Sequence, residues 1–280
     1  MAWSTNWPAP AKLNLFLHVT GRRNDGYHLL QTVFQFIDLS DSLDFEPTAD
    51  RGIELVTPIP GIEPEADLVT RAARGLQAAT GTNQGARIRI QKHLPIGGGL
   101  GGGSSDAATV LVALNQLWET GLTPSELAQI GLALGADVPI FVHGCTAWAE
   151  GVGEQLQPFD AAVTPAVIIN PNVQVNTGRV FSDSHLTRNT PTIKMHAFSL
   201  GRSRNDCEPV TRRLYPEVGE ALDWLGQFAT ARMSGTGASV FACVEEPEEA
   251  ASIVARVPSK WRADAVRRRN RSPLLDRLTQ

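Results

Sequence analysis

Six of the seven residues from Gly97 to Gly103 are glycine, and this run limits the possible folds more than any other segment. Glycine lets the backbone take positive φ and approach a ligand closely, so several N–H groups can point into one concavity. The residues that follow predict an amphipathic helix, because apolar side chains recur at helical spacing at Val110, Leu111, Leu114, Leu117 and Trp118. That helix would add unpaired N–H groups and the positive end of its dipole. The run therefore predicts a loop that binds phosphate.

Residues beside the glycines extend this candidate site. Ser104 and Ser105 can cap the helix and offer hydroxyls to phosphate or Mg²⁺. A flexible loop with serine caps is disfavoured, because the run lies between an expected strand and an amphipathic helix. We expect nucleotide contacts from the following residues: Lys92, Pro95, Ile96, Gly97, Gly98, Gly99, Leu100, Gly101, Gly102, Gly103, Ser104 and Ser105. Solvation would explain Lys92 nearly as well.

The run matches neither of the common phosphate-binding motifs. Gly97, Gly99 and Gly102 satisfy GxGxxG, but a dinucleotide-binding fold needs an acidic residue ending the next strand, about 20 residues further on. That position falls near Leu122, between two expected helices. A Walker A loop needs GK[ST], and Gly97–Ser105 contains no lysine. The phosphate loop therefore belongs to another class.

The rest of the chain predicts strands and helices without regular alternation, which favours two α+β domains over one doubly wound sheet. In the earliest strand, Leu13–Val19, every second residue is apolar, so Lys12 and Asn14 are expected together on the opposite face. The proline-containing segment 157–165 predicts a boundary between the two domains. We place these domains at residues 1–157 and 158–280.

Other elements follow from spacing and capping residues. A capping box at 123–126, with proline at the first helical position, begins a helix that we expect to end at Gly135. Further strands are expected at 32–39, 43–46, 86–91, 166–170, 240–244 and 263–267. Further helices are expected at 67–79, 207–214, 216–228 and 247–256.

Composition argues against several kinds of partner. The net charge of −4 does not indicate binding to nucleic acid or to an anionic membrane. The basic stretch Lys260–Arg277 is best explained as a solvated face. Cys145, Cys207 and Cys243 lie far apart, which argues against disulfides and zinc and fits a reducing cytoplasm. No signal peptide or apolar run of about 20 residues is visible. We expect a cytoplasmic monomer or homodimer without membrane or nucleic-acid partners.

Three segments, in order, resemble the motifs of the GHMP small-molecule kinases, named for galactose, homoserine, mevalonate and phosphomevalonate. They are PAKLNLFLHVTGRRNDGYH (10–28), PxxxGLGGGSSDAA (95–108) and MSGTGASVFA (233–242). The similarity covers nearly the whole chain and is weakest at 183–204 and after 258. It implies a ribosomal-protein-S5-like α/β domain, a ferredoxin-like α+β domain, and an active site in the cleft between them. It also implies transfer of the terminal phosphoryl group of ATP, with Mg²⁺, to a small-molecule hydroxyl.

Two shorter segments narrow this resemblance. GADVPIF (135–141) and AEGVGE (149–154) are similar to the subgroup that phosphorylates the 2-hydroxyl of a cytidine diphosphate-linked methylerythritol in the non-mevalonate route to isoprenoids. One alternative is a GHMP kinase for another alcohol, such as homoserine or mevalonate. A second alternative is a catalytically silent nucleotide-binding protein, which the presence of Lys12 and Asp137 disfavours.

The resemblance assigns roles that the residues alone leave open. By spacing alone, Asp137 fits a turn or cap aspartate and Lys12 a solvated lysine. The resemblance implies that Asp137 is the general base, and that Lys12 keeps it ionised and interacts with the acceptor hydroxyl or the phosphoryl group. It also implies that Asn14 reaches the polyol end of the acceptor. No protein ligand for the metal is assigned.

Further residues are implied for the two substrates. Tyr27, His28 and Phe181 match family positions that hold the flat cytosine ring, although a glycine turn and core packing would also explain them. Thr177 matches a contact near the substrate. Asp67 stands where family members often carry an asparagine against adenine, and an ionised aspartate cannot donate the hydrogen bond that an amide can.

Overall fold

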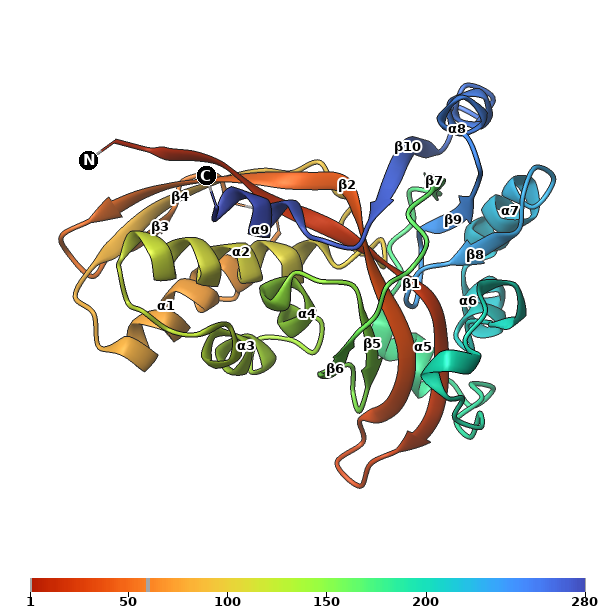
Figure 1. Ribbon diagram of the computed structural model, residues 1–280, viewed down its shortest axis with the longest axis horizontal. Helices are drawn as coiled ribbons and strands as arrows, with labels where there is room; N and C mark the ends of the chain where they lie inside the picture. The colour runs from red at the N-terminus through yellow and green to blue at the C-terminus, as the bar shows by residue number, and fades with distance from the viewer. Residues whose placement is uncertain (1, 59–60, 280) are drawn as a thin grey trace.

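Two long antiparallel strands run through both lobes of the molecule (Figure 1). These strands are β1 (Ser4–Arg22) and β2 (His28–Thr48). The computed structural model describes residues 2–58 and 61–279. Helices α1 to α4 lie in one lobe, and helices α6 to α8 lie in the other (Figure 1). The two strands therefore link the parts of the chain between which a site can form.

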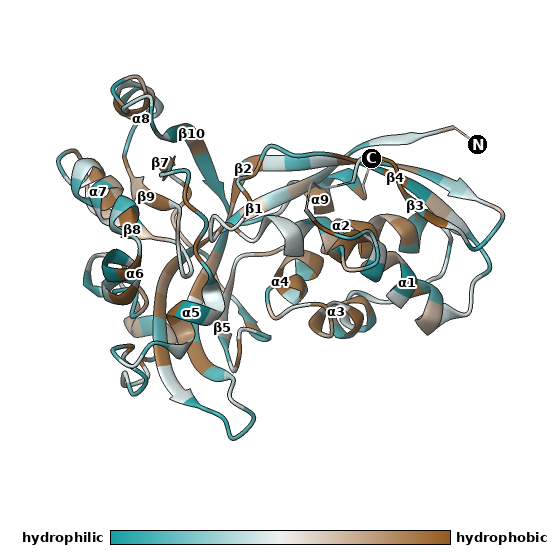
Figure 2. Cartoon of the chain, turned by 180° about the vertical axis from the view of Figure 1, so that it is seen from behind, coloured by the Kyte–Doolittle hydropathy of each residue, from teal (hydrophilic) through white to brown (hydrophobic). Residues whose placement is uncertain are grey.

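The first lobe is a sheet with helices packed against it. Besides β1 and β2, its strands are β3 (Ile53–Leu55), β4 (Gly85–Gln91), β5 (Ala147–Glu150) and β6 (Gln155–Pro158). Its helices are α1 (Leu68–Thr80), α2 (Gly102–Leu117), α3 (Pro124–Leu132) and α4 (Val138–His143). Every residue from 105 to 114 of α2 is buried, and Figure 2 shows this helix mostly in hydrophobic colours. The helix that follows the glycine run is thus the central helix of this lobe.

The second lobe has its own strands and helices. Its strands are β7 (Pro165–Asn170), β8 (Ala231–Met233), β9 (Val240–Cys243) and β10 (Arg262–Arg269). Its helices are α5 (Thr177–Ser182), η1 (Met195–Ala197), η2 (Leu200–Arg202), α6 (Glu208–Leu214), α7 (Pro216–Leu225) and α8 (Pro247–Val254). Strand β10 pairs with both β2 and β7, so the strands of the two lobes join in one ten-stranded sheet.

The hydrophobic core of each lobe contains residues from the other half of the chain. Leu17 and Val19, near the end of β1, pack in the hydrophobic core of the second lobe. Leu274, in the last helix α9 (Pro273–Arg277), packs in the core of the first lobe. The division between residues 157 and 158 remains a prediction. Residues from before it pack in the second lobe, and a residue from after it packs in the first lobe.

Strand β1 is buried on both faces rather than on one, and Lys12 and Asn14 lie together, as expected, with Nζ of Lys12 2.6 Å from Oδ1 of Asn14. Lys12 and Asn14 are only 2% and 3% exposed. Lys12 donates from its backbone N–H to the carbonyl of Leu100 at 3.0 Å and from Nζ to that of Gly99 at 3.3 Å, so the glycine loop covers this side of the strand. The alternation marked the core-facing side correctly, but tertiary packing covers the other side as well.

Other element boundaries differ from the expected ones. The segments 32–39 and 43–46 form one strand, β2. The capping box is present at Thr123, but α3 ends at Leu132 rather than at Gly135. Its C-cap residue is Ala133, which lies in the right-handed helical region. Helix α4, which begins directly after Asp137, was not expected.

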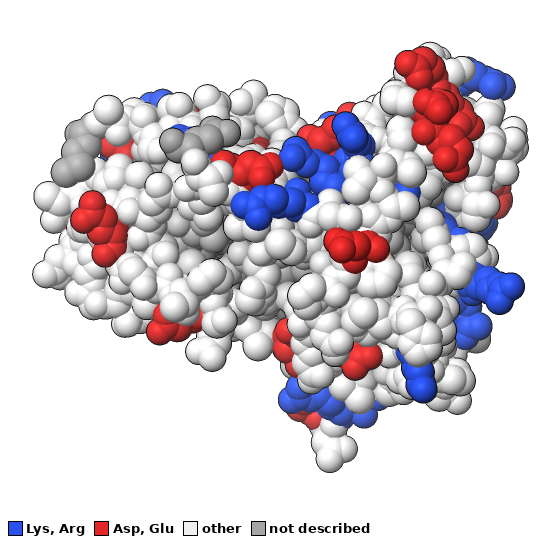
Figure 3. Space-filling view, viewed as in Figure 1, with Lys and Arg blue, Asp and Glu red and all other residues white. Residues whose placement is uncertain are grey.

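The basic C-terminal stretch, which we expected to be a solvated face, is solvated only in part. Arg268 is 3% exposed and donates to Gln35. Arg269 and Arg271 both pair with Asp276, at 2.9 and 2.8 Å. On the face in Figure 3, blue side chains between the lobes lie beside red ones. Part of this positive charge is therefore paired with carboxylates within the molecule.

Candidate active site

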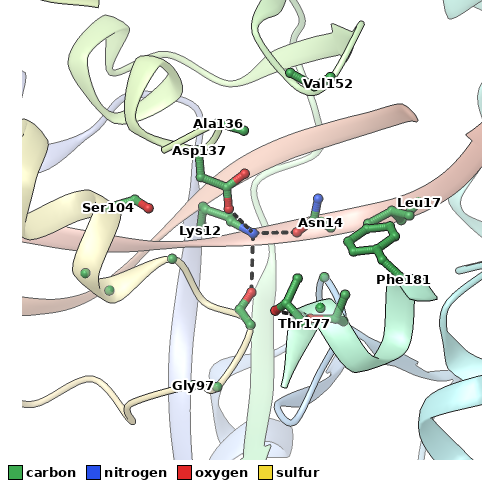
Figure 4. Close-up of a pocket in the computed structure, with 18 of the residues that line it drawn as sticks. Lys12, Asn14, Leu17, Gly97, Ser104, Ala136, Asp137, Val152, Thr177 and Phe181 are labelled. Carbon is green, nitrogen blue, oxygen red and sulfur yellow. Dashed lines mark hydrogen bonds and ion pairs between the residues drawn. The ribbon is translucent and has the colours of Figure 1, made fainter. Parts of the chain in front are cut away.

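A cavity of about 840 Å³ lies where β1, the glycine loop, α5 and the turn after β8 meet. Figure 4 shows residues of β1, the glycine loop and α5 around one space. Most residues predicted for the site line it: Lys12, Asn14, Tyr27, His28, Lys92, Pro95, Ile96, Gly97, Gly98, Gly99, Gly101, Gly102, Gly103, Ser104, Asp137, Thr177 and Phe181. Asp67, Leu100 and Ser105 do not line it.

The glycine loop takes a backbone shape that other residues resist. Gly97, Gly99 and Gly101 have φ values of 69°, 72° and 77°. A Cβ atom on Gly99 would lie 2.4 Å from the carbonyl oxygen of Ser234, and one on Gly101 would lie 2.7 Å from Cζ of Phe141. Gly101 is also the N-cap of α2, and no side chain caps this helix. The first N–H groups of α2 therefore remain available to an anion.

The predicted role of the two serines as caps is wrong. Both lie inside the first turn of α2, after its N-cap Gly101. Ser104 lines the cavity, whereas Ser105 is fully buried and its hydroxyl has no partner among the described residues. Leu100 points its side chain into the core. Within this loop, glycine backbone and Ser104 face the ligand space.

Lys12 joins three groups at the centre of the cavity (Figure 4). Its Nζ lies 2.6 Å from Oδ1 of Asn14, 3.3 Å from the carbonyl oxygen of Gly99 and 3.2 Å from Oδ2 of Asp137. The Lys12 side chain is 3% exposed, while that of Asp137 is 36% exposed. The Asp137 side chain does not cap α4, although the residue stands at its N-cap position. Its carboxylate therefore faces both the ammonium group and the open cavity.

The second lobe closes the site through a short turn. The hydroxyl of Ser234 donates to the carbonyl of Gly99 at 3.0 Å and accepts from the N–H of Asn14 at 3.2 Å. Thr236 lines the cavity, and its hydroxyl lies 2.9 Å from that of Thr177. These contacts fix the glycine loop and β1 against the other lobe.

A buried charge cluster supports the start of α2. Lys92 Nζ lies 2.5 Å from Oδ2 of Asp41 and 2.7 Å from Oδ2 of Asp106. Burial lowers the pKa of Lys92, but the charges and hydrogen bonds of Asp106 and Asp41 raise it above its ordinary value. Burial, aided by Asp41 and opposed by Lys92, raises the pKa of Asp106 to about 7. Lys92 is thus an ion-paired residue at the cavity wall rather than a solvated lysine.

An aromatic pair borders the cavity near the loop between β1 and β2. The rings of His28 and Phe181 stack, with centroids 5.0 Å apart and planes 23° apart. Tyr27 is 61% exposed beside them. Burial lowers the pKa of His28, and the charges of Arg188 and Arg22 lower it further. These effects favour the neutral imidazole.

Asp67 has a structural role in the fold. It is the N-cap of α1, and Oδ1 accepts a hydrogen bond from the N–H of Val69 at 2.8 Å. The residue is 4% exposed and lies outside the cavity lining. A contact with adenine has no support in this arrangement.

Some cavity residues were not expected from the sequence. Arg22, Asp25, Phe34 and Val152 line the cavity. Arg22 and Asp25 lie inside the segment GRRNDGYH, so its charged residues could have been considered together with Tyr27. Val152 lies inside the motif AEGVGE, whereas Phe34 carries no local signal of a site.

Comparison with known proteins places the chain in a family. Residues 67–145 match GHMP kinases N terminal domain, and residues 190–263 match GHMP kinases C terminal. A 4-diphosphocytidyl-2-C-methyl-D-erythritol kinase of Nitrosococcus oceani is 57% identical over 272 residues, covering 97% of each chain. The chain belongs to this family of GHMP kinases. A member from Halorhodospira halophila is 52% identical, covering 97% of this chain and 95% of its own.

Solved structures of the family agree with the fold described above. A crystal structure of 4-(cytidine 5'-diphospho)-2C-methyl-D-erythritol kinase matches with a TM-score of 0.82 and 35% identity, over 95% of this chain and 99% of that one. The expected two-domain α+β fold of the GHMP kinases is confirmed. No helix of the described residues is both long and apolar enough to cross a membrane.

Proposed function

We propose that this GHMP kinase transfers the terminal phosphoryl group of ATP to the 2-hydroxyl of 4-diphosphocytidyl-2-C-methyl-D-erythritol. The observation that carries the proposal is the contact of 3.2 Å between Lys12 Nζ and Asp137 Oδ2 inside the shared cavity. The glycine loop lies on one side of this pair, and the His28–Phe181 stack borders the same cavity. The named relatives, at 57% and 52% identity, act on this substrate by their names.

The geometry of Lys12 and Asp137 supports separate roles for the two residues in the phosphoryl transfer. Asp137 accepts the proton of the acceptor hydroxyl as its oxygen forms a bond to the terminal phosphorus of ATP and the bond from phosphorus to the ADP oxygen breaks. Lys12 is nearly buried, so its charge is weakly screened. It holds the carboxylate of Asp137 in place and stabilises the charge on the transferring group. Asn14 accepts from Lys12 at 2.6 Å and donates to Thr32 at 3.0 Å. It also lines the cavity, where we expect it near the polyol.

The glycine loop and α2 support binding of the ATP phosphates. Backbone N–H groups of the loop and of the uncapped helix start bind anions without a charged side chain. Lys92 adds an ammonium donor at the cavity wall, held in place by the two carboxylates that balance its charge.

Mg²⁺ accompanies ATP in nearly all phosphoryl transfers. Among residues 2–58 and 61–279, no group of three or more His, Cys, Asp or Glu is arranged to hold a metal. An ion that arrives on phosphates needs only one or two protein oxygens. The hydroxyl of Ser104 lines the cavity and fits this need (Figure 4). When bound, the ion neutralises charge on the phosphates.

The opposite side of the cavity suits a nucleobase. Phe181 and His28 present flat apolar faces, and the exposed Tyr27 ring lies beside them. Thr177, at the start of α5, adds a hydroxyl to this side. We infer that the cytosine lies among these rings, with the diphosphate leading from it toward Asp137.

The three cysteines bear on the cellular location of the protein. Cys145, Cys207 and Cys243 are all free thiols, which supports a reducing compartment such as the cytoplasm. We infer a monomer or a homodimer, which a mass measurement in solution decides.

Incubation of the protein with ATP, Mg²⁺ and a panel of alcohols tests the proposed function. The panel contains 4-diphosphocytidyl-2-C-methyl-D-erythritol, homoserine and mevalonate, and phosphorus NMR identifies the product. We expect turnover of the cytidine compound alone, with ADP and its 2-phosphate as products. A preference for an alcohol without cytidine would overturn the assignment, and nucleotide binding without turnover would indicate a silent relative.

A further inference from the structure

One arginine outside the cavity contacts both members of the aromatic pair. Arg188 Nε lies 3.1 Å from Nε2 of His28, and its Nη2 lies 2.9 Å from the carbonyl oxygen of Phe181. Arg188 does not line the cavity and lies in the segment that follows α5. It is therefore placed to act on the substrate through these two residues.

The remaining donors of Arg188 fix the segment from which Phe181 projects. Nη1 donates to the carbonyl of Leu186 at 3.2 Å, and Nη2 donates to that of Asp183 at 2.7 Å. A planar guanidinium that meets several acceptors at once holds them in a defined geometry, which the single ammonium of lysine cannot reproduce. The segment 181–188 is thus tied to the start of β2.

The contact with His28 also defines where the imidazole proton is. A guanidinium has five N–H donors and no acceptor, so Nε2 of His28 must be the acceptor in this hydrogen bond. The ring is then neutral and carries its proton on Nδ1. The charged groups facing this ring are Arg188, from the segment after α5, and Arg22, from β1; both oppose its protonation.

We propose that Arg188 is a positioning residue for the nucleobase, fixing His28 as the neutral imidazole with its proton on Nδ1 and holding this ring parallel to Phe181. The identity of the nucleobase rests on the proposed function, whereas the state of the imidazole does not. The consequence for the substrate is a preformed flat surface with one defined hydrogen-bond donor. The side chains of His28 and Phe181 then lose less conformational freedom when the substrate binds, which raises affinity without new contacts.

Nitrogen NMR of the histidine side chains tests the first part of the proposal without any substrate. In the wild-type protein at pH 7.5, we expect His28 to show a protonated Nδ1 and an unprotonated Nε2, with the signal assigned by its loss in His28→Gln. In Arg188→Met, we expect a mixture with the Nε2-protonated form. Arg179→Met is the matched control, because it removes an exposed charge from α5 without touching His28. A wild-type His28 that is cationic or protonated on Nε2, or an unchanged state in Arg188→Met, would overturn the proposal.

Steady-state kinetics and calorimetry test the effect on the substrate. For Arg188→Met we expect KM for the cytidine substrate to rise roughly 10-fold or more, as for loss of a charged hydrogen bond, with kcat and KM for ATP within about threefold. Arg188→Lys should recover only part of this loss, and Arg179→Met should match the wild type. Binding of cytidine 5'-diphosphate should weaken in parallel. An equal fall in kcat and kcat/KM, or full recovery by lysine, would contradict a positioning role.

The two proposals fail in different ways. If the wild-type enzyme does not phosphorylate the cytidine compound, the proposed function fails, while the NMR result on His28 still stands. If that activity is present and cytidine 5'-diphosphate binds equally well to wild type and Arg188→Met, only the role of Arg188 fails.

Discussion

Lys12 Nζ lies 3.2 Å from Asp137 Oδ2, although Lys12 is almost fully buried and Asp137 is about one-third exposed. A buried ammonium requires compensation, and here Asp137, Asn14 and the carbonyl of Gly99 supply it. The asymmetric exposure leaves the carboxylate free to meet a substrate hydroxyl while its charge stays balanced. This difference in exposure fits the proposed roles of Lys12 as the stabilising residue and Asp137 as the base.

A double-mutant cycle tests whether these two residues act as one unit. We expect Lys12→Met to lower kcat by roughly 10²-fold or more, because the carboxylate and the transferring group both lose their positive partner. In Lys12→Met with Asp137→Asn, the combined loss should be much smaller than the product of the two single losses. Strictly multiplicative losses would mean that the residues act independently.

The glycine loop should tolerate alanine at one position and not at another. Gly99→Ala should destabilise the protein by more than about 1–2 kcal/mol, because φ is +72° and the new Cβ would lie 2.4 Å from the Ser234 oxygen. Gly103→Ala is the matched control, since its Cβ would meet only Leu68 Cδ1 at 3.5 Å and alanine favours a helix. Urea denaturation of both variants checks this. Equal stabilities would show that the loop does not pack on the turn at Ser234.

Loss of Lys92 should be costly to stability as well as to nucleotide binding. Lys92→Met leaves Asp41 and Asp106, both nearly buried, without their cation, and we expect a loss of roughly 3–5 kcal/mol in the free energy of unfolding. Lys260→Met, which breaks the exposed pair with Glu220, should change it by less than about 1 kcal/mol. Thermal and urea denaturation measure both. A Lys92→Met protein as stable as Lys260→Met would contradict the described cluster.

Stability should fall in mild acid, partly because of His18. Burial lowers the pKa of His18, Asp206 raises it, and Arg204 lowers it again, with a net lowering. Below about pH 6.5, the unfolded chain takes up a proton there that the folded chain does not. The unfolded state then binds more protons, so the free energy of unfolding decreases as pH falls from about 7 to 5.

The variant His18→Gln should show a shallower decrease over the same pH range. Melting temperatures of the two proteins at several pH values make the comparison, and the difference between them should shrink as the pH falls. Parallel curves for variant and wild type would exclude a contribution from this residue.

Local signals in the sequence were sufficient for some parts of the site. The glycine run and the apolar stripe of α2 are contained in one segment, so spacing alone predicted a phosphate loop followed by a helix. The same reasoning failed for Ser105, because whether a serine caps a helix depends on where the first turn begins. Here Gly101 takes the N-cap position in a left-handed conformation.

Interactions between distant segments could not be predicted in this way. Asp41 pairs with Lys92 across β2 and the loop after β4, and no spacing rule connects them. The partnership of Lys12 with Asp137 was expected only from family resemblance, since each residue alone fits an ordinary surface position. Arg188 lies in the part of the chain where that resemblance was weakest, and only the fold brings it to His28.

Turnover of Asp137→Asn with ATP and 4-diphosphocytidyl-2-C-methyl-D-erythritol tests the central assignment most directly. Asparagine keeps the shape of the side chain and cannot accept the proton. The predicted result is a fall in kcat of roughly 10²- to 10⁴-fold, with ATP affinity and thermal stability close to those of the wild type. A variant that turns over at nearly the wild-type rate would contradict the role given to Asp137 and to its contact with Lys12.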